Sequence, residues 1–200
     1  MAYVPLATFK DAHDITETAR DAEYTRLLDA ASAAVDRWCR VEPGHFAPTT
    51  ATRYFDVTTG DAKRQAIAIP PLVSLTTLKT DENGDATYEV TWTVTTDYLL
   101  YPLNSVAKTE IQRVGVTGRY SFPVGQRTVQ IVGEWGEYTS TPMDIEEAVM
   151  LQANRWRFRS RSPEGVAGNA EVGFVKLASI DPDVAAILKH GRWRRPEVFA

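Results

Sequence analysis

Cysteine, histidine and long apolar runs are scarce in this sequence, and each scarcity excludes a class of protein. Cys39 is the only cysteine among 200 residues, which excludes an intrachain disulfide and a thiolate metal cluster. No uncharged apolar run approaches the roughly 20 residues that span a bilayer. Residues 1–14 lack the basic and apolar regions of a secretory signal. We therefore expect a soluble, cytoplasmic protein in a reducing compartment, with no membrane partner.

Sequence motifs for catalysis and cofactor binding are also missing. The three histidines, His13, His45 and His190, lie in different sections and have no spacing that places two on one helix face. The segment 115–118 has neither the spacing nor the Lys-Ser/Thr of a phosphate-binding loop, and no GxSxG occurs. Cys39 follows an apolar stripe and is interpreted as a buried structural thiol. The sequence therefore predicts no catalytic residue, no cofactor and no metal, and hence no enzyme.

The overall composition is ordinary for a globular protein, with 44% hydrophobic and 24% charged residues. The net charge of −4 and the pI of about 5.4 argue against a protein that wraps nucleic acid with its whole surface, although a local basic patch stays compatible. The length fits one domain, 1–200, with an elaborate insertion.

Residues 141–161 carry the pattern of a helix with one buried face. Thr141 suits the N-cap and Pro142 the first helical position, and acids at 144, 146 and 147 complement the helix dipole. One face collects the residues three and four apart, namely Ile145, Ala148, Val149, Gln152 and Trp156. The segment 21–40 repeats this spacing at Tyr24, Leu27, Leu28, Ala31, Val35 and Trp38. We expect these helices to pack together, with a short helix over 8–13 capped by Thr8, in a helical base of residues 8–45 and 141–190.

Between these helices the hydrophobic period changes to two, which predicts a β-rich insertion over 50–137. Turns are expected at 59–61 and, around Asn83-Gly84, at 81–85. About six to eight short strands are predicted, at 53–57, 65–69, 73–79, 88–95, 98–101, 110–114, 119–122 and 128–135. Their spacing favours an antiparallel sheet or a small barrel. The predicted fold class is α+β: a small helical bundle with an inserted antiparallel β-module and an extended C-terminal arm.

The C-terminal part contains one more helix and a basic, aromatic tail. Asp181-Pro182-Asp183 predicts a helix start and Gly191 its end, while 171–177 is interpreted as a short strand or extended arm. The arm, 191–200, pairs arginines with Trp193 and Phe199, residue types enriched at interface hot spots. We favour an interface anchor over a disordered end.

Two further surfaces are candidate contacts. The stretch 30–34 is small-sided, so another helix or subunit can approach it closely, and Ala30, Ala33 and Ala34 are the candidate subunit-interface residues. Arginines at 155, 157, 159 and 161 alternate along the sequence and spread around the helix. They are open to two interpretations, compensation of the helix dipole and a contact role.

In four passages the chain resembles the head–tail connector (adaptor, or head-completion) proteins of tailed bacteriophages. These are ASAAVDRWCR, TTATRYFDV, the junction from IVGEWGEY to TPMDIEEAVMLQANRWRFR, and SPEGVAG followed by DPDVAAIL. Each passage alone is made of common residues, and their order along most of the chain carries the resemblance.

The resemblance implies a structural subunit of a ring, which would be a dodecamer in the virion neck, beneath the portal protein. DNA would pass through its lumen during packaging and ejection, and a stopper or tail-terminator protein would bind the other face. The ring would assemble in the bacterial host cytoplasm. Carried onto this sequence, the portal-docking candidates are Arg192, Trp193, Arg194, Arg195, Val198 and Phe199.

The main alternative is a carbohydrate- or receptor-binding β-module of a phage structural protein. It would use an aromatic platform of Trp92, Tyr98, Tyr101 and Trp135. These residues lie in predicted alternating strands and suit a core equally well. An enzyme with scattered active-site residues is the weakest alternative, because no nucleophile, metal or phosphate motif is present.

Overall fold

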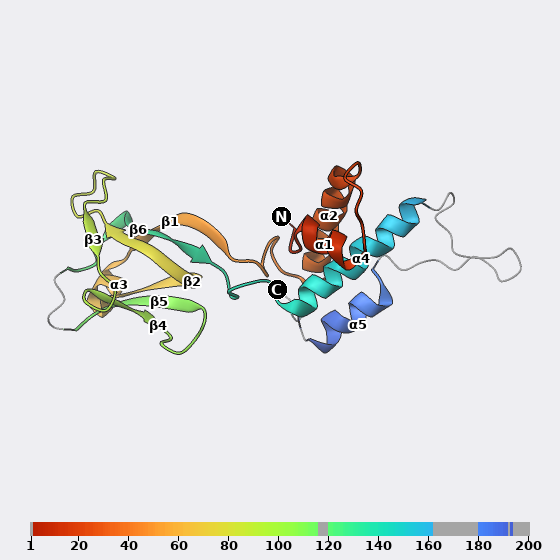
Figure 1. Ribbon diagram of the computed structural model, residues 1–200. Coiled ribbons are helices and arrows are strands. Elements are labelled where there is room, and N and C mark those ends of the chain that lie inside the picture. Colours follow the sequence, from red (N-terminus) through yellow and green to blue (C-terminus); the bar gives the residue numbers. More distant parts are fainter. Residues whose placement is uncertain (1, 116–119, 162–179, 192, 194–200) are drawn as a thin grey trace, which may run out of the picture. The chain divides into compact units, whose positions relative to one another are not determined.

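The computed structural model describes residues 2–115, 120–161, 180–191 and 193 (Figure 1). It divides into two compact units, Met1–Phe46 with Thr141–Ala200, and Ala47–Ser140. We call them the helical unit and the β unit. The described residues form five helices and one six-stranded antiparallel sheet, which confirms the predicted α+β class.

The helical unit contains α1 (Leu6–Ala12), α2 (Asp21–Cys39), α4 (Met143–Arg161) and α5 (Pro182–His190). As predicted, α2 packs against α4, and α4 also packs against α5 (Figure 1). The predicted faces are largely buried, while Leu27, Trp38 and Trp156 are half-buried. The fully buried positions of the two faces are Tyr24, Leu28, Ala31, Val35, Ile145, Ala148, Val149 and Gln152. The spacing therefore located the main helical contact.

A buried polar contact ties the N-terminus to α2. The backbone N–H of Tyr3 donates to Ser32 Oγ at 3.1 Å, and the Tyr3 hydroxyl donates to Asp36. Asp36 also accepts from the N–H of Gly44 at 3.1 Å, and Phe46 donates its N–H to the Tyr3 hydroxyl at 3.3 Å. Burial, and then the bond to Asp36, raise the pKa of Tyr3. This network holds the C-terminal half of α2 to Tyr3 on one side and to residues 44–46 on the other.

Two helix starts differ from the prediction. α1 begins at Leu6 after Pro5, whose carbonyl accepts from Phe9 N at 3.1 Å, so Thr8 lies inside the helix and is not its cap. α4 begins at Met143, because the Pro142 carbonyl accepts the N–H groups of Ile145 (2.9 Å) and Glu146 (3.1 Å). Pro142 thus precedes the first helical residue.

The β unit contains one short helix and six strands, joined in the order β1-β6-β2-β5-β4 with β3 pairing β2. The elements are β1 (Thr49–Val57), α3 (Thr59–Arg64), β2 (Ala66–Thr80), β3 (Val90–Trp92), β4 (Tyr98–Tyr101), β5 (Lys108–Arg113) and β6 (Gly125–Trp135). Inward residues of these strands form one apolar cluster that includes Leu72, Leu78, Trp92, Ile111 and Ile131. The predicted hairpin is confirmed, since Thr80 pairs with Val90 across the 81–89 loop.

Residues 65–79 were expected to form two strands separated by Pro70-Pro71, and this expectation is wrong. β2 runs through both prolines. It pairs with β5 at residues 66–72 and with β6 at 72–80, and the register shifts between Ala68 and Leu72. Proline cannot donate a ladder hydrogen bond, so this position suits the change of partner.

Other local differences have identifiable causes. The expected turn at 59–61 is the start of α3, because Thr58 and Asp61 form a capping box, with Asp61 N donating to Thr58 Oγ1 at 3.2 Å. The expected strand 88–95 is shorter, 90–92. Of the expected strand 119–122, the described residues 120–122 are not a strand. The rings of Tyr120 and Phe122 pack on the Trp92 ring, at centroid distances of 5.8 and 4.7 Å.

No helix in the described part of the chain is both long enough and apolar enough to cross a bilayer.

Candidate interaction surfaces

The C-terminal helix is fixed to α4 by polar contacts at its start. Asp181 caps α5, its carboxylate accepting from Asp183 N at 2.9 Å, which confirms the predicted helix start. The Asp181 carboxylate also bonds Arg155 Nη1 at 2.7 Å, and its backbone N–H donates to the buried Gln152 Oε1 at 2.9 Å. The position of α5 is therefore set by two side chains of α4, of which Gln152 lies on the predicted buried face and Arg155 does not.

After α5, Trp193 contacts other residues of the helical unit. Its backbone N–H donates to the Leu188 carbonyl at 3.2 Å, and its indole Nε1 donates to Asp144 Oδ2 at 3.2 Å. The indole ring meets the buried Phe46 ring edge-on, with centroids 5.7 Å apart and planes at 87°. The other proposed docking residues, Arg192, Arg194, Arg195, Val198 and Phe199, and the interpreted segment 171–177, lie outside the described residues.

The small-sided stretch of α2 is split between core and surface. Ala31 and Ser32 are buried, Ala33 and Ala34 are half-buried, and Ala30 is exposed. The three candidate subunit-interface alanines therefore lie at or beside the surface of α2. The methyl side chains at these three positions favour close approach of another helix.

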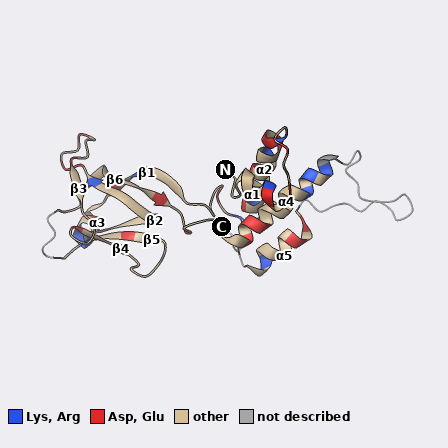
Figure 2. Cartoon of the chain, viewed as in Figure 1, with Lys and Arg blue, Asp and Glu red and all other residues tan. Residues whose placement is uncertain are grey.

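Charge is distributed along α4 as the sequence indicated, with acids at its start and arginines towards its end (Figure 2). Arg155 pairs with Asp181, and the Arg157 guanidinium lies 5.7 Å from the Tyr24 ring centroid. Arg159 is exposed, and the Arg161 side chain is outside the described part. Two of the four arginines thus have contacts within the chain, which neither interpretation from sequence had foreseen.

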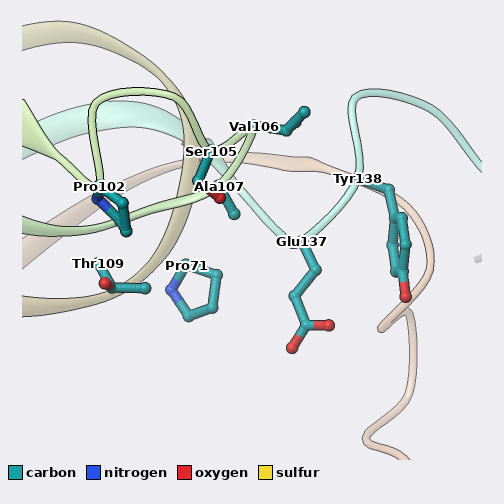
Figure 3. Close-up of a pocket in the computed structure, with 8 residues that line it drawn as sticks. All are labelled: Pro71, Pro102, Ser105, Val106, Ala107, Thr109, Glu137 and Tyr138. Carbon is teal, nitrogen blue, oxygen red and sulfur yellow. The ribbon is translucent and has the colours of Figure 1, made fainter.

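An open hollow of about 460 Å³ lies in the β unit beside the β4–β5 connection (Figure 3). Three separate segments supply its lining residues, which are Pro71, Pro102, Ser105, Val106, Ala107, Thr109, Glu137 and Tyr138. Lys108 Nζ donates to the carbonyls of Pro102 (2.9 Å) and Leu103 (2.8 Å), which fixes the connection. Leu103 and Val106 are 58% and 57% exposed. Sequence reasoning missed this apolar surface; the signal was a pair of aliphatic residues inside a predicted loop.

Three acidic residues of the β2–β3 loop come close together. Carboxylate oxygens of Asp81, Asp85 and Glu89 lie within 4.8 Å of one another, a donor type that suits a hard cation. Both Asp81 oxygens, however, accept backbone N–H groups, Oδ1 from Gly84 at 2.7 Å and Oδ2 from Ala86 at 2.8 Å. A bond from Thr87 N–H lowers the pKa of Asp85. These bonds define the shape of the loop by themselves.

The aromatic platform of the alternative function is not on the surface. Trp92, Tyr98 and Trp135 are each 3% exposed and belong to the apolar core of the β unit, while Tyr101 is half-buried. The Trp92 and Trp135 indoles donate to Thr80 Oγ1 and the Ala51 carbonyl, both at 2.9 Å. A sugar ring cannot reach side chains that are buried in the core, so this proposed use of Trp92, Tyr98 and Trp135 is wrong.

Comparison with solved structures identifies a chain of similar fold. Over 98% of this chain and 91% of the other, the fold resembles a chain in the neck of a native gene transfer agent (GTA) particle computed with C12 symmetry, at 21% identity and a TM-score of 0.51. A chain in the virion of a native gene transfer agent particle is matched over 98% and 92%, at 22% identity and a TM-score of 0.46. No protein-family model and no curated protein matches the sequence. At this identity the comparison shows a shared fold.

Proposed function

We propose that this chain is a structural subunit of the neck of a tailed-phage-like particle and has no catalytic role. The observation that carries the proposal is the likeness of fold, over almost the whole of both chains, to a neck chain of a gene transfer agent. The four passages that resemble head–tail connectors support the same role from sequence. The buried aromatics of the β unit remove the support for a carbohydrate-binding alternative.

In its finer form, the proposal is a dodecameric adaptor ring under the portal protein, with a stopper or tail terminator on the other side. The C12 symmetry of the similar neck structure supports a twelvefold ring. Such a ring needs a heterologous interface, in which one patch meets a different patch on the neighbour. We assign the α2 surface of Ala30, Ala33 and Ala34 to this interface.

The charge of the chain suits a conduit for DNA. A net charge of −4 gives weak or repulsive interaction with phosphates, so DNA can pass through the lumen during packaging and ejection without being held. The C-terminal segment, with Arg192, Trp193, Arg194, Arg195, Val198 and Phe199, is proposed to dock on the portal. Assembly would take place in the bacterial host cytoplasm.

Cryo-electron microscopy of particles that contain this chain tests the proposal. We expect twelve copies in one ring between capsid and tail, and a truncation lacking residues 192–200 that folds but no longer co-sediments with portal-bearing capsids. Finding the chain elsewhere in the particle would refute the neck role. Normal co-sedimentation of the truncated chain would refute only the docking role of the C-terminal segment.

A further inference from the structure

We infer that Trp193 is a positioning residue, which anchors the root of the C-terminal segment in a seat on its own helical unit. The seat consists of Phe46, Asp144 and Gly191. This inference rests on the proposed docking of the C-terminal segment. It narrows the residues proposed to contact the portal to those beyond 193, and it gives Trp193 the separate task of fixing where those residues begin.

The first argument is the number of directional contacts on one side chain. The indole N–H is bound to Asp144 at the start of α4, and the ring meets Phe46, which is itself 1% exposed. The Phe46 ring also packs edge-on against the Tyr3 ring, with centroids 5.8 Å apart. The indole therefore rests on a surface that is already fixed by the buried Tyr3 network, and its own backbone is bonded to Leu188.

The second argument is the identity of residue 191. Gly191 ends α5 with φ −69° and ψ −7°, a conformation open to any L-residue, so the backbone does not require glycine here. Space does require it. A Cβ at 191 would lie 2.0 Å from Trp193 Nε1 and 2.4 Å from Cδ1. The absence of a side chain at Gly191 thus leaves the space that the Trp193 indole occupies.

The consequence is a fixed position for Trp193, the residue that precedes the remaining docking candidates. Arg194 and Arg195 follow the anchored residue directly in sequence. Fixing the residue before them removes conformational freedom that binding would otherwise have to remove, which increases affinity without adding a contact to the partner. An alanine at 191 should therefore weaken docking although residue 191 touches no partner.

The test compares Trp193→Ala, Trp193→Phe and Gly191→Ala with Gly60→Ala as control. A Cβ at Gly60 has only Thr58 Oγ1 within 4 Å, at 3.5 Å, so the control adds the same methyl group without displacing a neighbour. Docking is measured on each full-length variant, and the seat is measured on the wild type and the two glycine variants, which keep the indole. Nuclear Overhauser contacts between the Trp193 indole and the Phe46 ring report the seat, and co-sedimentation titrations with portal-bearing capsids report docking.

For the wild type and Gly60→Ala we expect the indole–Phe46 contact and full docking. Gly191→Ala should lose the contact and bind about tenfold more weakly, as should Trp193→Ala, since about 1.4 kcal/mol of ordering is a factor of ten. Trp193→Phe keeps a ring but loses the Asp144 bond, so its affinity for capsids should lie between those of the wild type and Trp193→Ala.

Three results would overturn the inference. Absence of the contact in the wild type removes the seat. Unchanged docking by Gly191→Ala after loss of the contact removes the positioning role. If Trp193→Ala weakens docking and Gly191→Ala does not, Trp193 contacts the portal directly. If the wild type itself fails to bind capsids, the proposed function and the positioning role both fail, while the seat is still decided by the indole–Phe46 contact.

Discussion

Buried polar side chains have different tasks in the helical unit and in the β unit. In the helical unit they join distant segments: Tyr3 to Asp36, 33 residues apart, and Gln152 to Asp181, 29 residues apart. In the β unit the buried carboxylates of Asp81 and Asp97 bond only nearby backbone, as from Thr93 N to Asp97 at 2.7 Å, four residues apart, while the Trp135 indole reaches the Ala51 carbonyl, 84 residues away. The long-range order of the β unit comes instead from its strand ladder and apolar cluster.

This difference implies that the two units respond differently to the same kind of change. Loss of one polar group should loosen a whole helix in the helical unit, and only a turn in the β unit. Loss of apolar volume should be costly in both, because each has a close-packed core.

The largest effect is expected for Leu28→Ala and Leu78→Ala, which remove the same volume from the two cores. Both leucines are buried, at 1% and 0% exposure, so each substitution should destabilise its own unit by about 3 kcal/mol. Urea unfolding followed by amide hydrogen exchange would show the loss in the helical unit for the first variant and in the β unit for the second. Equal loss in both units for either variant would mean that they unfold as one.

Gly133→Ala should be the next most damaging, and only in the β unit. A Cβ at 133 would lie 2.4 Å from the Ser74 carbonyl oxygen and 2.8 Å from Leu72 Cδ1, where the β2–β6 register shifts. Because backbone must move to admit the methyl group, we expect a cost of about 2 kcal/mol and faster exchange of β2 amides. A stability equal to the wild type would show that this register shift is easily displaced.

Gln152→Met tests the long-range polar contact directly. Methionine keeps the volume but leaves the Asp181 N–H without its acceptor, so we expect a loss of about 1–2 kcal/mol and faster exchange throughout α5. Asp97→Asn is the comparison in the β unit. It keeps an acceptor for Thr93 N, and its effect should be below about 1 kcal/mol and confined to 93–97. If both substitutions accelerated amide exchange over equally long segments, the two units would not differ in how they respond to loss of a polar group.

The smallest effect is expected from pH. Burial, followed by the Arg157 guanidinium, lowers the pKa of His13 against the opposing charges of Glu147 and Asp14. The unfolded chain therefore binds the proton more tightly than the folded one. The stability contribution is complete above about pH 6.5 and is lost as the pH falls below it towards the folded pKa.

All three histidines belong to the helical unit. Between pH 7 and 5.5 we expect its unfolding midpoint to fall slightly, while that of the β unit stays constant, and His13→Gln should flatten the dependence. A parallel shift in the β unit would assign the effect to other groups.

Periodicity predicted those elements whose burial follows a regular spacing. The stripes of α2 and α4, the cap at Asp181 and the strand at 98–101 were all located from sequence. α3 was missed although the Thr58–Asp61 capping pattern was available, because Gly60 favoured a turn. The course of β2 through two prolines could not be predicted, since it depends on which strands flank it.

The seat of Trp193 was equally hidden. The composition of residues 191–200 indicated a free tail that binds a partner. The contacts that fix Trp193 lie 49 residues away at Asp144 and much farther away at Phe46. Neither partner has a sequence spacing that points to an indole. The hollow beside Lys108 was missed for the same reason, because segments brought together only by the sheet form it.

The pairing of the first and last strands of the β unit has an evolutionary consequence. Thr49 lies opposite Trp135, so the incoming and outgoing leads of this unit start from adjacent positions at one end of the sheet. A segment with neighbouring termini can be lengthened, trimmed or exchanged for another without stretching the chain that carries it. The β unit can therefore be remodelled while the helical scaffold stays the same.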